Sequence, residues 1–374
     1  MKKILIISKN YPHKNLSQND KIISLIINEL SNSFDFYYLI EKKDSNKALK
    51  NSFFYSIFYN KFKFLSKIMN LLRRLMPIFF ENIDAQSILY SFEKIKDQRF
   101  DYIFGYSFPF SSILAANYIY RKHNIKYLCY FFDYFSIRHK YSTNNHLFNN
   151  YEKKILTNSF LNIFPKSLDF ANEFFDYSSN NNIVTGYPLL NHKKILTLNS
   201  TLNKKLTFIY SGILQKNIRE PDLLVEFYSK LPENCLKIII FKGKYMKYLS
   251  KVSKKIPNLY IFENLSSFEA QKMIEVSDIL VNLSNKITYQ MSSKIIEYLN
   301  YEKPIINLHY ENDNFYRYYA TSNFVLNVSN NQLKGFNINH LEKYFSQIKN
   351  SNAQFVFENS TENIKRLIID KLGL

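Results

Sequence analysis

Short apolar runs alternate along the chain with segments whose apolar residues recur at helical spacing. Near the start, Lys3-Ile-Leu-Ile-Ile-Ser8 is an unbroken apolar run with polar flanks, which is typical of a strand buried on both faces. Apolar residues then recur every three or four positions from 22 to 30, and a second apolar run covers 36–40. Strand, helix and strand at this spacing predict the opening of a doubly wound parallel sheet.

The same rhythm runs through two halves of the chain. The first half has further predicted strands at 102–105, 127–132, 160–164 and 183–184, and a helix at 111–120. In the second half we predict strands at 206–210, 236–241, 259–262, 279–283 and 304–308, with helices at 222–231 and 267–276. Residues 191–205 are polar, rich in Lys and Asn, and typical of a linker. The pattern therefore predicts an α/β protein with domains at 1–190 and 206–358.

A last amphipathic helix is predicted at 359–374, where Asn359 and Glu362 stand in the positions of a helix cap and its third residue. This helix is placed after the second domain in the sequence, and we expect that it can pack back on the first domain.

Residues 45–80 interrupt the rhythm of the first half. Phe53, Phe54 and eight later apolar residues fall roughly at helical spacing, and no acidic residue occurs between 45 and 80. Basic residues lie among them, notably Lys61, Lys63, Lys67, Arg73 and Arg74. A basic, Phe-rich amphipathic segment is typical of a helix in a membrane interface, where each basic residue adds about 1 kcal/mol on an anionic leaflet. The alternative is a helix that covers the sheet and exposes its lysines to water.

Composition narrows the class of protein. The net charge of +19 attracts polyanions, but no concentrated basic face or nucleic-acid-binding module is present, so we expect no nucleic-acid partner. Cys129 and Cys235 each lie in an apolar run, which fits buried thiols in a reducing compartment. The first apolar run is too short for a signal peptide. We therefore expect a cytoplasmic protein, peripheral on the inner face of the cell membrane.

The stretch Ser292–Ile306 carries the candidate chemistry. It predicts a polar loop, one short helix and a buried strand, with Ser292 and Ser293 as helix starters. Lys294 and Glu297 follow in the first turns, where a cation, free N–H groups and a carboxylate can hold a phosphate and a sugar hydroxyl. The alternative is a surface αβ unit with an exposed lysine and glutamate.

This stretch resembles a family signature. Ser292-Ser-Lys-Ile-Ile-Glu-Tyr-Leu-Asn-Tyr-Glu-Lys-Pro-Ile-Ile306 is similar to the Pro-Ser-Lys…Glu-Tyr…Lys-Pro-Ile motif of GT-B glycosyltransferases of family 4 type. Phe208-Ile-Tyr-Ser-Gly212, Arg219–Glu226 and Glu269–Asn282 resemble neighbouring parts of the same family. The resemblance covers roughly 206–308 and is weaker before that range. It implies two Rossmann-like domains facing a central cleft, with a nucleoside diphosphate sugar as donor.

Roles follow from the resemblance by position. Glu297 matches the glutamate that accepts hydrogen bonds from the ribose hydroxyls. Lys294, with the N–H groups near Ser292 and Ser293, would hold the diphosphate. Arg219 stands at the family's phosphate-binding lysine, and Gly212 would let the backbone approach the ligand.

The first half supplies the catalytic candidates. Asp133 follows a predicted strand, and His13 lies in the loop after the first strand. The alternatives are a capping role for Asp133 and a solvated loop histidine. The resemblance implies a hexosyltransferase of the retaining type from bacterial capsule or surface-polysaccharide synthesis, with a lipid-linked or oligosaccharide acceptor, no cofactor and no metal ion.

Several positions depart from the family pattern. Ile213 replaces an arginine, Tyr289 replaces the first of two glutamates, and Phe132 replaces the histidine that often precedes Asp133. Asp313 lies in an Asp-x-Asp-like stretch, but we expect no hydrophobic strand to lead into it and no metal site there. These departures leave open a non-catalytic glycan-assembly partner with a degenerate transferase fold.

Overall fold

The chain forms two compact units. The first comprises Met1–Leu168, Asn172–Pro188 and Thr361–Leu374, and the second comprises Asp169–Ala171 and Leu189–Ser360. The computed structural model describes residues 1–12, 18–42, 51–56, 72, 76–107, 109–132, 135, 145–165, 181–189, 205–286, 292, 294–301, 303–311, 313, 315–320, 322, 324–337, 339, 341, 343–344 and 353–373. Most of the expected linker, residues 191–204, lies outside these ranges.

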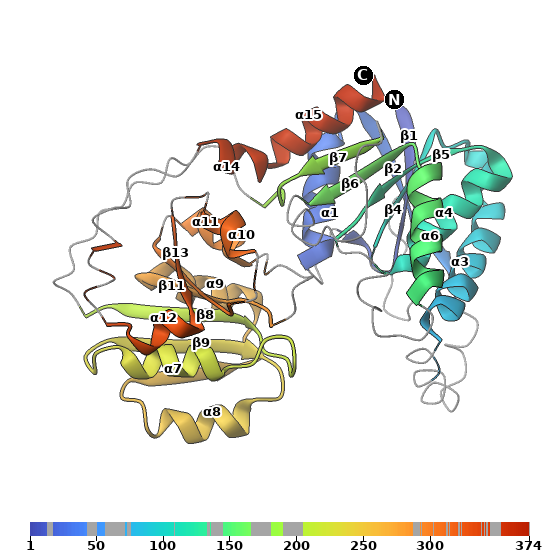
Figure 1. Ribbon diagram of the computed structural model, residues 1–374. Coiled ribbons are helices and arrows are strands. Elements are labelled where there is room, and N and C mark those ends of the chain that lie inside the picture. The colour runs from blue at the N-terminus through green and yellow to red at the C-terminus, as the bar shows by residue number, and fades with distance from the viewer. Residues whose placement is uncertain are drawn as a thin grey trace. The chain divides into compact units, whose positions relative to one another are not determined.

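The first unit is built on a parallel sheet of seven strands in the order β3-β2-β1-β4-β5-β6-β7 (Figure 1). Residues Ile4 to Ile7 of the first strand are almost completely buried, because helices cover both faces of the sheet. The strands are β1 (Lys2–Ser8), β2 (Phe34–Glu41), β3 (Ser52–Tyr55), β4 (Tyr102–Tyr106), β5 (Lys126–Tyr130), β6 (Leu161–Pro165) and β7 (Asn182–Thr185). The prediction of a doubly wound sheet in this half is confirmed.

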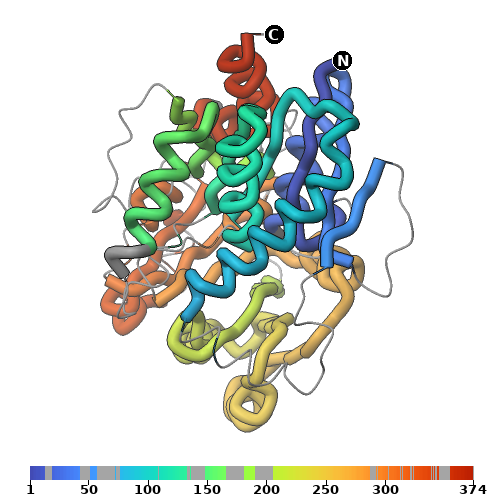
Figure 2. The backbone as a smooth tube through the Cα atoms, turned by 90° about the vertical axis from the view of Figure 1, so that its right-hand side faces the viewer, coloured from blue at the N-terminus to red at the C-terminus, as the bar shows by residue number. Residues whose placement is uncertain are grey.

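Helices flank this sheet in two layers. Figure 2 shows α6, α4 and α3 side by side, and Figure 1 shows α1 and α15 together. The helices are α1 (Gln18–Leu30), α3 (Pro77–Glu93), the 3-10 turn η3 (Lys96–Gln98), α4 (Phe110–His123), α6 (Asn145–Asn158) and α15 (Thr361–Leu372). Helix α4 lies so close to β4 that a Cβ atom on Gly105 would be 2.9 Å from the Ser112 carbonyl oxygen. The close packing therefore depends on glycine at this position.

The second unit repeats the design with six parallel strands in the order β10-β9-β8-β11-β12-β13. The strands are β8 (Thr207–Ile213), β9 (Leu236–Lys242), β10 (Leu259–Glu263), β11 (Ile279–Leu283), β12 (Ile305–His309) and β13 (Val325–Ser329). The strand order reverses between β8 and β11, which are neighbours in space but not in sequence. Ligands of doubly wound folds bind at the carboxyl ends of the strands beside this switch point.

Helices again cover both faces. Helices α7, α8 and α12 share one apolar core with one face of the sheet, and helices α9, α10 and α11 lie on the other face (Figure 1). The bounds are α7 (Asp222–Lys230), α8 (Met246–Ser253), α9 (Ser267–Val276), α10 (Lys294–Tyr298), the 3-10 turn η5 (Leu299–Tyr301), α11 (Tyr316–Ala320), α12 (Asn330–Lys334) and α14 (Ala353–Glu358).

A row of amides crosses the second sheet on the side of α10. Asn282, Asn307 and Asn327 occupy the same register in β11, β12 and β13. Asn282 Nδ2 donates to Asn307 Oδ1 at 2.8 Å, and Asn307 Nδ2 donates to Asn327 Oδ1 at 2.8 Å. The ladder satisfies polar groups that would otherwise be buried without partners.

Two sequence-based predictions of secondary structure are wrong. Phe53 and Phe54 belong to the edge strand β3, not to an amphipathic helix, and pair in parallel with β2. Asn359 does not cap the last helix, which begins at Thr361. The Asn359 side chain instead accepts from the Tyr318 hydroxyl at 2.8 Å and donates to the Phe355 carbonyl. Because both polar atoms of the Asn359 side chain bond to Tyr318 and Phe355, the side chain does not cap the helix as its local sequence predicts.

The basic residues proposed for membrane contact, Lys61, Lys63, Lys67, Arg73 and Arg74, lie outside the described residues. Across the described ranges, no helix combines the length and the apolar character needed to span a bilayer.

Glu93 links two helices of the first unit and gives stability a pH dependence. Its Oε1 lies 2.6 Å from Lys122 Nζ and 2.8 Å from His123 Nε2. Hydrogen bonds from Lys122 and then His123 lower the pKa of Glu93 from 4.5 to about 2. A carboxylate with a lowered pKa stabilises the fold above its unfolded pKa and loses that contribution as pH falls through its folded pKa.

We expect Glu93→Gln to lower the free energy of unfolding by about 1 kcal/mol at pH 7, after allowance for solvent screening. The difference from wild type should stay at full size down to about pH 4.5 and vanish toward pH 2. Urea unfolding at several pH values measures it. A difference that is independent of pH would contradict the electrostatic role of Glu93.

Candidate functional site

Gly212 stands at the carboxyl end of β8, beside the switch point. A Cβ atom here would lie 2.7 Å from the hydroxyl oxygen of Tyr210. Burial holds that tyrosine in place, and its hydroxyl donates to the Ile213 carbonyl at 3.4 Å. Glycine is therefore needed for local packing, and it also leaves the strand end open to a ligand. The next residue, Ile213, is 58% exposed. Its side chain is apolar, so it supplies no cation to a ligand.

Arg219 is held at the end of a tight turn after β8. Its backbone N–H donates to the Gln215 carbonyl at 2.8 Å, and Gln215 donates back at 2.9 Å. Asn217 closes the turn with a left-handed φ of 64°, a conformation that asparagine tolerates. The Arg219 Nε donates to Asn285 Oδ1 at 3.0 Å. One of the guanidinium's donors is thus used to orient the group.

The loops after β8 and β11 are joined by further contacts. The Lys286 backbone N–H donates to the Ile218 carbonyl at 2.6 Å, and its ammonium group pairs with the Glu220 carboxylate. The hydrogen bond that Lys286 donates to the Glu220 carboxylate raises the pKa of Lys286. The pKa of Glu220 is lowered by the Asn217 N–H and by Lys286. This pair was not predicted, since residues 66 apart in unrelated loops give no sequence signal.

Ser292 is a buried anchor and not the helix starter that we predicted. Its hydroxyl donates to Asn282 Oδ1 at 2.9 Å, and its carbonyl accepts from the Tyr319 hydroxyl at 2.6 Å. The hydroxyl is thereby attached to the amide ladder and turned toward β11. Helix α10 begins two residues later and has only five residues before it tightens into η5, so its dipole is smaller than a long helix would provide.

Lys294 and Glu297 share one face of α10. The Lys294 Nζ lies 3.1 Å from Glu297 Oε2, and both side chains are partly exposed. An ion pair of this kind contributes little to stability. Each side chain can therefore leave its partner and bind a ligand at a small cost in free energy.

Tyr298 ties α10 to the switch point. The parallel pairing of β8 with β11 ends at Tyr210 and Val281. In the next position, the Ser211 N–H donates to the Tyr298 hydroxyl at 2.9 Å, and that hydroxyl donates to the Ser211 carbonyl at 3.2 Å. Tyr298 thus takes over the hydrogen bonds that β11 no longer makes. This contact brings the helix of Lys294 and Glu297 to the strand end that carries Gly212.

Three predicted site residues remain without a structural account. His13, Asp133 and Ser293 lie outside the described residues, as does Tyr289.

Asp313 follows β12 in the sequence but is not part of it, since the strand ends four residues earlier at His309. Within the described ranges, no group of three His, Cys, Asp or Glu residues is arranged to hold a metal ion.

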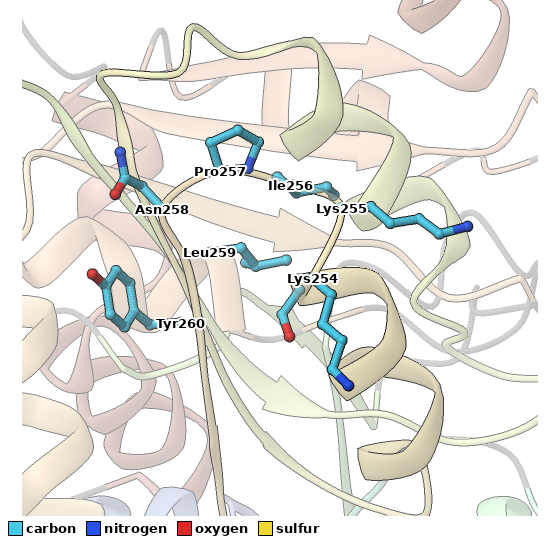
Figure 3. Close-up of a pocket in the computed structure, with 8 residues that line it drawn as sticks. Lys254, Lys255, Ile256, Pro257, Asn258, Leu259 and Tyr260 are labelled. Carbon is cyan, nitrogen blue, oxygen red and sulfur yellow. The ribbon is translucent and has the colours of Figure 1, made fainter.

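A cavity of about 360 Å³ occurs elsewhere in the second unit, lined by residues 253–260. It lies at the amino end of β10, whereas Gly212 and α10 mark the carboxyl ends of the strands. Lys254 and Lys255 point in different directions there (Figure 3). The cavity is therefore separate from the candidate site.

Comparison with solved structures identifies the fold. The chain is similar to a lipopolysaccharide outer core galactosyltransferase, WaaB, in its apo form (15% identity, 99% of this chain and 100% of that one, TM-score 0.63). It is also similar to HepE of Anabaena in complex with UDP and glucose (10% identity, both chains fully covered, TM-score 0.64). A third similar structure is sucrose-phosphate synthase from Thermosynechococcus elongatus (9% identity, 100% and 95% coverage, TM-score 0.66).

These structures are GT-B glycosyltransferases, and the predicted GT-B fold is confirmed. No protein-family model and no curated protein sequence matches the chain.

We expect Tyr298→Phe to lower the free energy of unfolding by about 2 kcal/mol, because it leaves the Ser211 N–H and carbonyl buried without partners. Urea unfolding of the full chain measures the loss. Tyr260→Phe is the control, since that side chain is 51% exposed and should change stability little. Equal unfolding midpoints for the two variants would contradict the role given to Tyr298.

Proposed function

We propose that the chain is a glycosyltransferase that moves a sugar from a nucleoside diphosphate donor to an acceptor. The observation that carries the proposal is the set of Gly212, Arg219, Lys294 and Glu297 around the carboxyl ends of β8 and β11. This is where doubly wound folds bind ligands. The similarity to glycosyltransferase structures, one of them described in complex with UDP-glucose, supports the same reading.

Each group has a task that suits its chemistry. The Glu297 carboxylate accepts hydrogen bonds from the two vicinal hydroxyls of the ribose. Arg219 and Lys294 bind the diphosphate and stabilise the charge that develops on it as the glycosidic bond breaks. Asn285 fixes the Arg219 guanidinium through Nε, and the Tyr210 side chain also makes a hydrogen bond with Arg219. The guanidinium has five N–H donors, so the remaining ones serve the phosphate oxygens. Gly212 allows the diphosphate to approach the strand end.

The finer assignment is a hexosyltransferase of the retaining type that acts in bacterial capsule or surface-glycan synthesis. Asp133 and His13 of the first unit are the proposed catalytic groups, and the acceptor is lipid-linked. Arg219 and Lys294 supply positive charge to the diphosphate, so the reaction needs no metal ion and no cofactor.

The first unit is proposed to touch the membrane. Leu72, Met76 and Phe79 recur at helical spacing and are 36%, 49% and 51% exposed. They adjoin in sequence the acid-free basic stretch that contains Lys61, Lys63, Lys67, Arg73 and Arg74. Exposed apolar residues beside basic ones suit an anionic lipid surface, and such contact brings the enzyme to a lipid-linked acceptor.

A second candidate is a non-catalytic partner in glycan assembly that keeps the transferase fold. The exposed Ile213 favours it, because the resemblance places a phosphate-binding arginine there. Such a protein would bind a sugar nucleotide without releasing the free nucleoside diphosphate in the presence of any acceptor.

Binding of UDP-, GDP- and dTDP-sugars tests the donor site. We expect one of them to raise the melting temperature of the wild type in buffer with EDTA. Glu297→Ala should abolish the shift without lowering the melting temperature of the free protein, since Glu297 is partly exposed and its ion pair is weak.

Glu233→Ala is the matched control for this experiment, because Glu233 is exposed at the amino end of β9 and should leave the shift intact. Unchanged binding in the Glu297 variant would refute its role, and binding that requires a divalent metal would refute the metal-free donor site.

Membrane contact is tested by co-sedimentation with vesicles of anionic phospholipid. We expect charge reversal of Lys61, Lys63, Lys67, Arg73 and Arg74 to release the protein into the supernatant. Reversal of five exposed lysines in the second unit, Lys247, Lys251, Lys254, Lys255 and Lys272, is the control for net charge. Equal release by both variants would mean that charge alone, and not this segment, causes binding.

A further inference from the structure

Asp313 is a buried carboxylate that the donor-site proposal does not use. Its side chain is 3% exposed. The backbone N–H donates to the Tyr310 carbonyl at 2.9 Å, and Oδ1 accepts from the Phe315 N–H at 2.8 Å. The second oxygen, Oδ2, has no hydrogen-bond partner among the described residues. A buried carboxylate oxygen without a donor is costly, so it calls for a functional or structural reason.

The described polar neighbours of Asp313 leave Oδ2 without a hydrogen in this structure. Ser284, at the end of β11, lies close enough to lower the pKa of Asp313, but its hydroxyl donates to Asn307 Oδ1 at 3.2 Å. His309, at the end of β12, has its Nδ1 at 3.1 Å from the Tyr310 carbonyl, which can only accept. The ring therefore carries its hydrogen on Nδ1 when neutral, and its Nε2 is an acceptor.

Burial is the main influence on this carboxyl group. It raises the pKa of Asp313, and the hydrogen bonding of Ser284 and of the Phe315 N–H, together with the charge of His309, lowers that pKa by less. The group is thus held in a setting where a hydrogen-bond donor from outside would stabilise its charged form.

A chain of hydrogen bonds connects this setting to the donor site. Ser292 donates to Asn282, Asn282 donates to Asn307, and Asn307 also accepts from Ser284, next to Asp313. Ser292 comes just before α10, which carries Lys294 and Glu297. Asp313 thus belongs to the polar layer at the carboxyl ends of β11 and β12, on the same face as α10 and α11.

We propose that Asp313 Oδ2 accepts a hydrogen bond from a hydroxyl of the donor sugar and so helps to select the sugar. This inference rests on the proposed function. A neutral, hydroxyl-rich group fits because it brings the missing hydrogen, whereas a phosphate would be repelled by the carboxylate. In the proposed donor site, Glu297 binds the ribose, and Lys294 and Arg219 bind the diphosphate. The sugar is the remaining part of the donor, and Asp313 would contact it.

The experiment compares each nucleotide sugar with its sugar-free nucleoside diphosphate. The probe is the UDP-, GDP- or dTDP-sugar that gives the largest thermal shift, and calorimetry measures both affinities. We expect Asp313→Asn to weaken the nucleotide sugar about tenfold, the value of a hydrogen bond to a charged group. The affinity for the free diphosphate should not change. Asp313→Ala, which removes both oxygens, should give at least the same loss.

Stability separates this role from a purely structural one. The amide in Asp313→Asn can still accept from the Phe315 N–H, and it removes a desolvated charge, so the melting temperature of the free protein should be equal or higher. Asp278→Asn is the control, since Asp278 accepts from the Thr207 N–H at 2.8 Å at the amino edge of the same sheet. It should change neither affinity.

The outcomes are distinct. Equal loss of affinity for nucleotide sugar and diphosphate, or unchanged affinity for both, would overturn the role of Asp313 and leave the donor site standing. A lower melting temperature together with weaker binding of both ligands would assign Asp313 to structure alone. If the wild type bound no sugar nucleotide and no diphosphate, both this inference and the proposed function would fall.

Discussion

The second unit depends on how one pair of backbone groups is satisfied where two parallel strands part. Beyond Val281, β11 no longer pairs with β8, and Ser211 would be left with a buried N–H and carbonyl. The Tyr298 hydroxyl bonds to both. Because unpaired backbone groups are expensive in the interior, this contact fixes the distance between the strand end and α10. Gly212 and Glu297 are neighbours of the two partners in sequence, so the position of the candidate site follows from the same contact.

An ion pair and a hydrogen bond join the loops at the carboxyl ends of β8 and β11, and hydrogen bonds to asparagine amides fix the residues next to the sheet. The Glu220–Lys286 pair and the Arg219–Asn285 hydrogen bond join the loops after β8 and β11. Below them, Ser292 and Ser284 both attach to the ladder of Asn282 and Asn307. A binding group that is already oriented loses less conformational entropy when a ligand arrives. Asp313 shows the opposite condition, a group whose hydrogen bonding is incomplete without a partner.

The sequence was sufficient for the overall architecture because buried parallel strands have an unmistakable pattern. The runs Ile4–Ile7 and Ile279–Val281 are continuous and apolar, and their alternation with helical periods leaves few topologies. Local chemistry was harder to predict. Ser292 has the composition of a helix starter but bonds to Asn282, and Asn359 has that of a cap but bonds to Tyr318. In each case the decisive partner lies on another element, which no local pattern reveals.

The asparagine ladder also bears on how the sheet reaches its correct register. An apolar strand can slide by two residues along its neighbour and still present apolar side chains to the same face. Asn282, Asn307 and Asn327 remove that freedom, since a slide of β12 would separate the amides and leave each of them buried in an apolar layer. Paired polar residues inside a core are known to specify register in this way. The three asparagines thus specify the register of these strands, and two of them hold Ser284, just after β11, and Ser292, just before α10.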